Sequence, residues 1–272
     1  MMRIKMKENV KKMKTDIYVV SHKDVAVPNT AIYQPVQVGF SEKNFSGFKR
    51  DNQGDNIAAK NANYCELTAQ YWGWKNDDAD VKGLVHYRRL FLNGKKHLFD
   101  SAEKKRADIL DEEHLNELLS RYDLILPTKR NYYIETLWSH YEHSHHIEGL
   151  GVTRQVIKEF YPEYLTTFDD VMQRKSAHMF NMLIAKNTVF TAYNTWLFDV
   201  LQKVEERIDI TNYSPSEARI FGYISELLMD VWVDRNKVNY TELPVMFMEK
   251  QNWIKKGSSF VIRKFRKKAV EI

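Results

Sequence analysis

The chain contains 272 residues, of which 43% are hydrophobic and 13% aromatic, so a disordered protein is excluded. This length suits one large folded domain, or one domain with a helical appendage. Cys65 is the single cysteine, which excludes an internal disulfide framework and favours a reducing compartment. The sequence has no run of about 18 uninterrupted apolar residues, and residues 1–14 lack the apolar segment of a secretory signal. We therefore expect a cytoplasmic protein.

The net charge of +5 is unevenly distributed along the chain. Residues 1–14 carry +5 and residues 253–272 carry +6, which leaves −6 for the body between them. A uniformly basic nucleic-acid-binding protein would not have this distribution. In the tail, aromatic and aliphatic residues alternate with lysine and arginine, a mixture typical of an interfacial helix. We expect the tail to contact an anionic membrane surface, with a solvated, frayed end as the alternative; for the N-terminal arm we favour the frayed end.

The first apolar run follows the basic arm. Residues 16–23 are rich in β-branched and aromatic side chains and end in polar ones, which predicts a buried strand, and residues 36–39 predict a second short one. His22, at the end of the first strand, is a candidate contact for a nucleotide base or ribose; an ordinary surface position is the alternative. Between Ser41 and Ala62 apolar periodicity disappears. We interpret this stretch as a substrate loop without a metal, because its carboxylates do not match the EF-hand pattern.

The most informative stretch lies near residue 85. A helix is predicted over residues 64–76, and residues 81–85 then form a short apolar run typical of a buried strand. Four polar or aromatic residues follow the strand directly: His86, Tyr87, Arg88 and Arg89. Ligands of open α/β sheets bind outside the carboxyl ends of the strands, where two arginine forks suit a diphosphate. The alternative is a structural ion pair with the acidic turn at residues 77–80.

A second predicted strand also ends in cations. Residues 122–127 form a short buried run, and Lys129 and Arg130 come soon after it. We expect the ends of the predicted strands to lie at one edge of the sheet, where they would create a pocket for a phosphorylated donor. The candidate donor-binding residues are His22, His86, Arg88, Arg89, Lys129 and Arg130.

Residues 131–146 are rich in tyrosine and histidine. They do not match the His-Glu-x-x-His pattern of zinc enzymes, and the cysteine is remote. Aromatic rings next to polar groups suit the faces and hydroxyls of a sugar, so we interpret Tyr132, Trp138 and His140 as candidate acceptor contacts. Structural packing of these side chains is an equal alternative, and no metal site is assigned.

The second half of the chain is mainly helical. Helices are predicted over residues 152–160, 164–174, 188–207 and 216–232, with a last buried strand over residues 178–185. The final helix carries Arg219 and Glu226 seven residues apart, two turns along one face. From the residues alone, solvated charges are the default interpretation of this pair. No internal repeat is present.

Several stretches together resemble a bacterial family from capsular and exopolysaccharide gene clusters, long known as a domain of unknown function. The most specific are the block from Gly83 to Arg89 and the helix beginning Glu66-Leu67-Thr68-Ala69. The other matching stretches are residues 17–23, 54–57 with 60–61, 71–76 and 219–226. The resemblance extends over about residues 16 to 245, and the basic tail lies outside it.

This resemblance implies a fold and an activity. The fold would be α/β and GT-A-like, that is Rossmann-like, with a mostly parallel central sheet flanked by helices and a helical C-terminal part. It would form a single domain over residues 16–250, between an arm at 1–15 and a tail at 251–272. The activity would be transfer of galactose or galactofuranose from a nucleotide-sugar, a UDP-sugar above all, to a lipid-linked oligosaccharide acceptor.

The resemblance also raises the question of a metal. GT-A enzymes typically carry an Asp-x-Asp at a central strand end, where a divalent ion bridges the diphosphate, but Asp78 and Asp80 precede the strand. We infer that arginine and lysine neutralise the leaving diphosphate instead, and no Mn²⁺ or Mg²⁺ is assigned. An inverting transfer needs a general base, for which the resemblance suggests Glu226 and His178, with Asp55 behind them.

Two other classes of function are considered beside the transferase. A non-catalytic carbohydrate-binding or assembly module would keep the aromatic side chains but need no diphosphate pocket. A nucleic-acid-processing enzyme would use the same cationic edge, but the acidic body argues against it, so no nucleic-acid partner is expected. The glycosyltransferase is the favoured interpretation, in the cytoplasm and at the inner face of the membrane.

Overall fold

The computed structural model describes residues 13–39, 41, 43–94 and 102–248. The basic tail, for which we predicted contact with a membrane, lies outside these residues, as does most of the basic arm. No helix in the described part of the chain is both long and apolar enough to span a bilayer.

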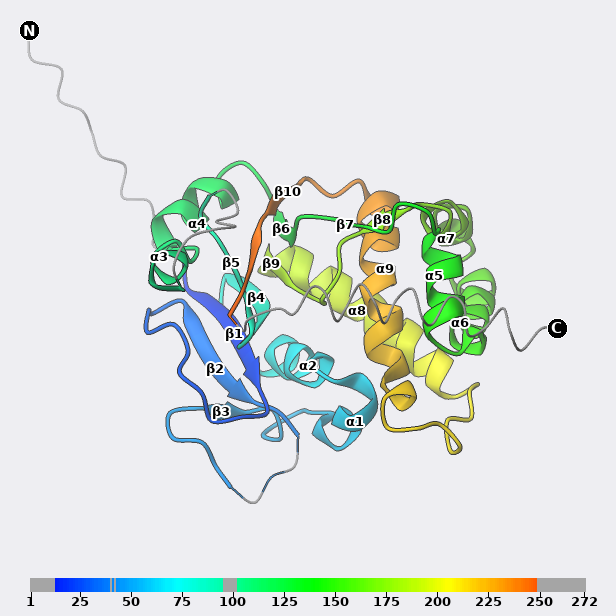
Figure 1. The fold of residues 1–272 in the computed structure, drawn as a ribbon, viewed down its shortest axis with the longest axis horizontal. Coiled ribbons are helices and arrows are strands. Elements are labelled where there is room, and N and C mark those ends of the chain that lie inside the picture. Colours follow the sequence, from blue (N-terminus) through cyan, green and yellow to red (C-terminus); the bar gives the residue numbers. More distant parts are fainter. Residues whose placement is uncertain (1–12, 40, 42, 95–101, 249–272) are drawn as a thin grey trace, which may run out of the picture.

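A mixed sheet forms the centre of the fold (Figure 1). Its main path runs in the order β10-β6-β9-β4-β1-β2-β3, and β5 and β11 extend it beside β4. The bounds of these strands are β1 Thr15–Ser21, β2 Tyr33–Gln37, β3 Lys49–Arg50, β4 Val81–His86, β5 Arg89–Phe91, β6 Leu124–Pro127, β9 Leu183–Lys186, β10 Tyr240–Leu243 and β11 Val245–Phe247. A separate small ladder joins β7 (Arg130–Asn131) to β8 (Ser176–Ala177).

The strand directions place several carboxyl ends at one edge. β1 is parallel to β2 and to β4, and β6 is parallel to β10. β9 is antiparallel to both of its neighbours, β4 and β6, so those two strands run in the same direction. Along the main path of described strands, β9 therefore runs against the rest. The prediction of a mostly parallel sheet is confirmed, and β1, β4 and β6 open at a common edge.

The central strands are buried on both faces, which explains their continuous apolar runs. All seven residues of β1 are buried, and so are the first five of β4. Gly83 in β4 is opposite Ile184 of β9, and a Cβ at position 83 would come within 2.8 Å of the Ile184 side chain. The close approach of these two strands therefore requires a glycine.

Helices cover the two faces of this sheet. Their bounds are α1 Asn61–Tyr64, α2 Leu67–Asn76, α3 Ala102–Ala107, α4 Glu112–Leu119, α5 Leu137–Ser144, α6 Ile147–Phe160, α7 Leu165–Met172, α8 Asn187–Glu205 and α9 Ile220–Asn236. Single 3-10 turns lie at Ala58–Lys60, Pro162–Tyr164 and Glu217–Arg219. The helices α5, α6 and α7 gather at the end of the molecule away from β1–β3 (Figure 1).

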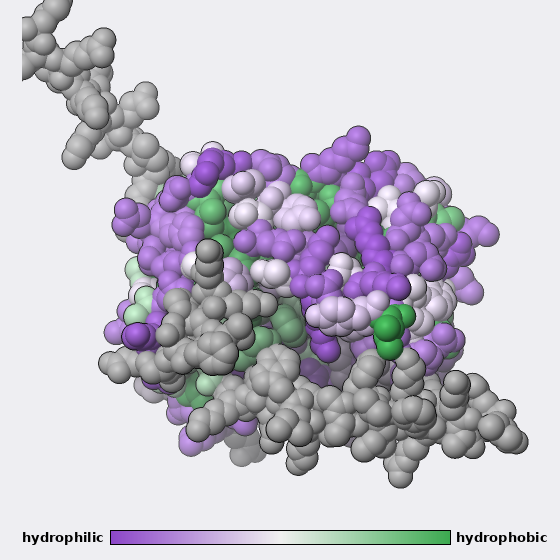
Figure 2. Space-filling model, turned by 45° about the horizontal axis from the view of Figure 1, so that its top comes forward, coloured by the Kyte–Doolittle hydropathy of each residue, from purple (hydrophilic) through white to green (hydrophobic). Residues whose placement is uncertain are grey.

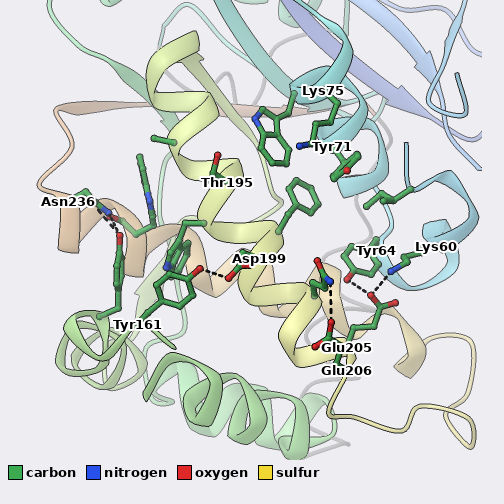
Figure 3. A pocket seen from close by; sticks show the side chains of 18 residues that line it. Lys60, Tyr64, Tyr71, Lys75, Tyr161, Thr195, Asp199, Glu205, Glu206 and Asn236 are labelled. Carbon is green, nitrogen blue, oxygen red and sulfur yellow. Dashed lines mark hydrogen bonds and ion pairs between the residues drawn. The ribbon is translucent and has the colours of Figure 1, made fainter. Parts of the chain in front are cut away.

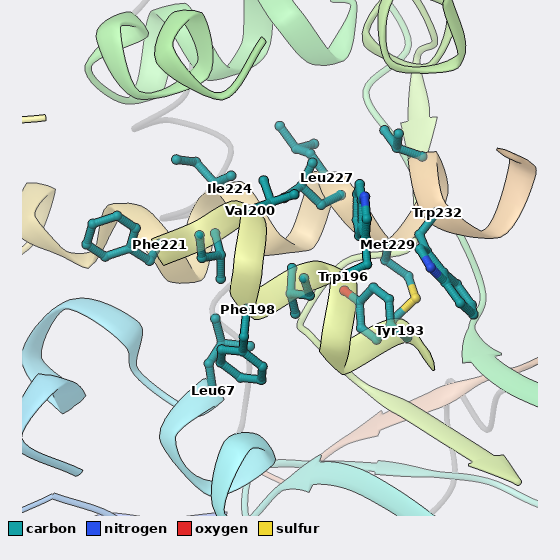
Figure 4. Packing of buried hydrophobic residues seen from close by; sticks show 14 of the residues in the cluster. Leu67, Tyr193, Trp196, Phe198, Val200, Phe221, Ile224, Leu227, Met229 and Trp232 are labelled. Atoms are coloured by element: carbon teal, nitrogen blue, oxygen red, sulfur yellow. The ribbon is translucent and has the colours of Figure 1, made fainter. Parts of the chain in front are cut away.

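Each face of the sheet has its own core. Tyr18 and Leu84 belong to the larger cluster, which also contains the buried sides of α8 and α9. Figure 4 shows Val200 of α8 near Ile224 and Leu227 of α9 in this cluster. Side chains of β1 that point the other way, such as Ile17, join a smaller cluster with α4. The alternation along the strand thus builds a three-layer arrangement around the sheet.

Two predicted elements differ from the structure. The predicted helix over residues 64–76 is broken at Cys65, whose φ of 54° is not helical, so α1 and α2 are separate. The predicted strand over residues 178–185 begins only at Leu183, because Phe180 and Asn181 have φ of 80° and 52°. It is also not the last strand, since β10 and β11 return to the sheet.

Candidate functional site

A cavity of about 490 Å³ opens where the carboxyl ends of β1 and β4 meet the start of α9. Residues from seven separate stretches of the chain line it. At the ends of β1 and β2 are Val20, Ser21, His22 and Val38; around α1, Asn61, Ala62, Cys65 and Glu66; from the end of β4 onward, His86, Tyr87, Arg88 and Arg89; and later in the chain, Arg130, Phe180, Arg219, Tyr223 and Glu226. The cavity thus lies at the edge where α/β sheets bind ligands.

Four arginines line this cavity, and each of them lies against an aromatic ring. The distance from the guanidinium carbon to the ring centre is 5.2 Å for Arg88 on Tyr87, 4.5 Å for Arg89 on Phe180, 5.0 Å for Arg130 on Tyr132 and 5.7 Å for Arg219 on Tyr223. Such contacts fix the planes of the forks without using their hydrogen-bond donors. The donors remain suited to the oxygens of an anion.

Arg89 is the most enclosed of these cations. Its side chain is half-buried, and no described residue accepts a hydrogen bond from its Nε. Burial lowers the pKa of the guanidinium, although the nearby Glu226 carboxylate acts in the opposite direction. A buried donor without an acceptor costs free energy, and an anionic ligand would remove that cost.

Two carboxylates lie on the same cavity, Glu66 from the start of α2 and Glu226 from α9. The Phe180 N–H donates to Glu226 Oε1 at 3.0 Å, and the Asn181 amide donates to Glu66 Oε1 at 2.8 Å. Burial and then the charge of Glu66 raise the pKa of Glu226 to about 7, against the N–H bond and the charge of Arg89. A carboxylate tuned to this range can exchange a proton near neutral pH.

A left-handed turn at Phe180 and Asn181 connects the two carboxylates to His86. Besides the two bonds to the carboxylates described above, the turn accepts one bond: the Phe180 carbonyl accepts from His86 Nε2 at 2.6 Å, so this ring nitrogen carries the proton. Burial lowers the pKa of His86, which favours the neutral ring. The Asn181 side chain also bonds Ser225 at 2.7 Å and the Gly222 carbonyl at 3.0 Å in α9. The positive φ of both turn residues therefore aligns the strand end with α9.

Most of the predicted donor-binding residues are brought together by the structure. His22, His86, Arg88, Arg89 and Arg130 all line the cavity, as the shared edge of the strands predicts. Lys129 does not; its backbone N–H donates to Glu242 at 3.4 Å. The binding roles of the five residues stay predictions.

Only one of the three candidate bases lines the cavity. His178 is 2% exposed, its Nδ1 bonds Asp230, and its Nε2 lies 3.1 Å from Glu242. It joins α9 to β10 as a structural group and has no contact with the cavity, so its place argues against a role as base. Asp55 also lies elsewhere and accepts from the Tyr71 hydroxyl at 3.1 Å. Glu226 remains the candidate.

The predicted acceptor contacts do not line the cavity either. Tyr132 is 8% exposed and lies under Arg130, with its ring centre 4.2 Å from that of His140. His140 bonds Glu135 at 2.9 Å, and Trp138 packs against the hydrophobic core. These positions favour the alternative of structural packing for the three residues.

The structure adds residues that the sequence pattern did not single out for the cavity, notably Glu66, Cys65 and Tyr223. Arg219 also enters it, and its Nε donates to Cys65 Sγ at 3.0 Å. The sequence offered only local hints that these residues belong to the site. Glu66 lies in the specific block at the start of α2, and the spacing of Arg219 and Glu226 was visible, but nothing near them in the sequence indicated their partners.

The acidic turn does not pair with the arginines. Residues 77–80 precede β4 and lie at the opposite edge of the sheet, where Lys14 Nζ is 3.6 Å from Asp77 and the Lys14 N–H donates to Asp80 at 2.9 Å. The alternative of an ion pair between this turn and Arg88 or Arg89 is therefore wrong. Among the described residues, no group of three or more histidine, cysteine or acidic side chains is arranged to hold a metal ion.

A second, larger cavity of about 1100 Å³ runs along α8 (Figure 3). It shares no lining residue with the first, and no arginine lines it. Its polar groups mainly bond one another: the Tyr161 hydroxyl bonds Asp199, and Glu205 accepts from Tyr64 at 3.0 Å and from Lys60 at 2.6 Å. It is therefore a poorer place for a phosphorylated ligand than the arginine-lined cavity.

The chain is similar to a known family and to a solved structure. The chain has 30% identity and a TM-score of 0.80 to the apo structure of WbbM, a bifunctional glycosyltransferase, over 87% of its own length. This match confirms the GT-A-like α/β fold, although the chain spans only 46% of that longer chain. The model of the family described as Domain of unknown function (DUF4422) matches residues 16–237, so the chain belongs to that family. No curated protein matches the chain.

The raised pKa of Glu226 has a consequence for stability. In the folded chain this pKa is about 7, against 4.5 for a free carboxyl. Below pH 4.5 the Glu226 carboxyl is protonated in both the folded and the unfolded chain. As the pH rises toward 7, the carboxyl ionises first in the unfolded chain, so the free energy of unfolding decreases. The decrease is complete above the folded pKa. Glu226→Gln should therefore raise the melting temperature by about 5 °C at pH 8 and change it little at pH 5. Thermal unfolding at both pH values checks this, and a difference independent of pH would contradict it.

Proposed function

We propose that the chain is a glycosyltransferase that uses a nucleotide-sugar donor. One observation carries the proposal: four arginines and a carboxylate of raised pKa share a cavity at the carboxyl edge of the sheet. The family has no assigned function of its own, and the likeness to a bifunctional glycosyltransferase supports the class of reaction. Fold likeness alone would be weaker support, because function depends on the site.

In this proposal the arginines hold the donor diphosphate. Arg88 and Arg89 follow β4 directly, and Arg130 and Arg219 approach from other parts of the chain. Charge-assisted bonds from planar forks suit phosphate oxygens, and they stabilise the negative charge that develops on the leaving diphosphate. In this proposal His22, which directly follows β1 and lines the cavity, contacts the base or ribose.

Glu226 acts as the general base of an inverting transfer. Its carboxylate takes the proton of the acceptor hydroxyl, the hydroxyl oxygen forms a bond to the anomeric carbon, and the bond from that carbon to the diphosphate breaks. The nucleoside diphosphate leaves with the electron pair. Glu66 beside it raises the proton affinity of the base, which suits work near neutral pH.

The finer assignments rest on the family resemblance. We propose UDP as the nucleotide, galactose or galactofuranose as the sugar, and a lipid-linked oligosaccharide as the acceptor, in synthesis of capsule, exopolysaccharide or O-antigen. The reaction would take place in the cytoplasm at the inner face of the membrane, with the basic tail on anionic lipid.

The experiment is a screen of nucleotide-sugars by thermal shift, followed by a donor-consumption assay with and without EDTA. Binding to the folded form raises the melting temperature by mass action, so UDP-sugars should stabilise the chain. EDTA should leave transfer unchanged if arginines neutralise the diphosphate. Loss of transfer in EDTA with rescue by Mn²⁺ would contradict the arginine mechanism, and binding without turnover would favour a non-catalytic module.

A further inference from the structure

A small apolar tip projects from the chain next to the arginine-lined cavity. Tyr133 is 80% exposed and Ile134 is 65% exposed, and the third large hydrophobic side chain exposed in the described part of the chain, Phe160, reaches 42%. On the face drawn in Figure 2, hydrophilic residues dominate and hydrophobic ones form small separate areas. Two neighbouring side chains with this exposure therefore stand out.

The tip is held rigidly from both sides. The Ile134 N–H donates to the Tyr132 carbonyl at 2.7 Å across Tyr133, whose φ is 60°, so the tip is a γ-turn in a strained conformation. Before it, the Tyr132 N–H donates to the Lys175 backbone carbonyl at 2.8 Å. After it, Glu135 is 7% exposed and accepts from two histidines of α5. The backbone thus fixes both apolar side chains outward instead of letting them fold back.

The surroundings of the tip are basic, although the body of the chain carries a net negative charge. Arg130 in β7 and Lys175, which directly precedes β8, are both exposed, and Lys129 precedes β7. The acidic side chain next to the tip, Glu135, is buried and bonded. Arg130 also lines the cavity, so the tip and the cavity mouth share an edge.

We propose that Tyr133 and Ile134 insert into an anionic lipid surface and orient the cavity mouth toward it. A tyrosine and an aliphatic side chain between cations is the composition that enters the interfacial layer of a bilayer. A second copy of the chain fits less well, because a stable protein interface buries about 800 Å² on each partner, more than two side chains provide. The proposal does not depend on the reaction assigned above.

The test measures binding of the full chain to vesicles by co-sedimentation. The vesicles contain phosphatidylcholine with about one third phosphatidylglycerol, and pure phosphatidylcholine vesicles serve as the uncharged comparison. The double variant Tyr133→Ser/Ile134→Ser should partition about tenfold less than the unchanged chain, because the apolar contact is lost. Lys175→Ala should lower partition about fivefold on the anionic vesicles alone.

Phe160→Ser is the matched control, since it removes an exposed aromatic ring from α6 and should leave partition unchanged. Melting temperatures confirm folding, and Ile134→Asp alone replaces the double variant if that variant fails to fold. The proposal is overturned if the double variant binds vesicles as the unchanged chain does, if Phe160→Ser loses as much, or if the unchanged chain does not bind at all. It is also overturned if light scattering shows a dimer that the double variant abolishes.

Discussion

Replacing Arg89 with methionine is expected to weaken binding of UDP about a hundredfold while leaving the unliganded chain at least as stable. The side chain is half-buried, its Nε has no acceptor among the described residues, and burial lowers its pKa. Methionine fills similar space without a desolvated charge, so stability is kept. The diphosphate, however, loses charge-assisted hydrogen bonds, and two or three kcal/mol correspond to that factor. Isothermal titration calorimetry with UDP measures it.

The matched control is Arg121→Met. Arg121 is an exposed arginine just after α4 that bonds Glu117 at 2.7 Å and does not line the cavity. Its variant should bind UDP like the unchanged chain. Arg88→Lys, which keeps the charge but removes the fork, should weaken binding about tenfold. Equal affinity for UDP in the unchanged chain and in Arg89→Met would remove the arginines from the donor site.

Replacing Glu226 with glutamine is expected to reduce turnover about a thousandfold and to leave the affinity for UDP within about threefold. Glutamine can still accept the Phe180 N–H but cannot take a proton from the acceptor. The pH profile gives an independent check. Since the pKa of Glu226 is raised to about 7, the rate of the unchanged chain should fall as the pH drops below 7, where the carboxyl becomes protonated. Initial rates of UDP release between pH 5 and 9 measure both effects.

Two further variants separate this role from a structural one. Glu113→Gln changes an exposed carboxylate on α4 and should leave rate and profile unchanged. Glu66→Gln removes the charge that raises the pKa of Glu226, so the acidic limb of its profile should move to lower pH. If Glu226→Gln retains nearly full turnover with intact folding, Glu226 is not the base.

Local sequence patterns predicted the strands that are buried on both faces of the sheet. β1, β4 and β6 are continuous apolar runs because helices cover both sides of the sheet, and such runs are visible in any window of the sequence. Because ligands bind at the carboxyl ends of parallel strands, the sequence predicted a common site for Arg88, Arg89 and Arg130, and these three residues line one cavity. Lys129 shows the limit of the rule, because neighbouring residues after a strand point to different sides.

The parts that were missed depend on contacts between distant segments. Glu66 enters the site because Asn181, 115 residues later, donates to it, and no local pattern records such a pairing. The left-handed turn at Phe180 shortened a predicted strand, since neither residue of the turn is the glycine that usually marks positive φ. His178 had the chemistry of a base, but its two carboxylate partners come from α9 and β10 and were invisible in its own neighbourhood.

A crystal structure of the chain soaked with UDP would show whether the arginines at the sheet edge bind the diphosphate. The two phosphates should lie in the cavity of about 490 Å³, with oxygens within hydrogen-bond distance of Arg88 or Arg89. Nucleotide bound in the groove along α8, or phosphates turned away from every arginine of the cavity, would contradict it.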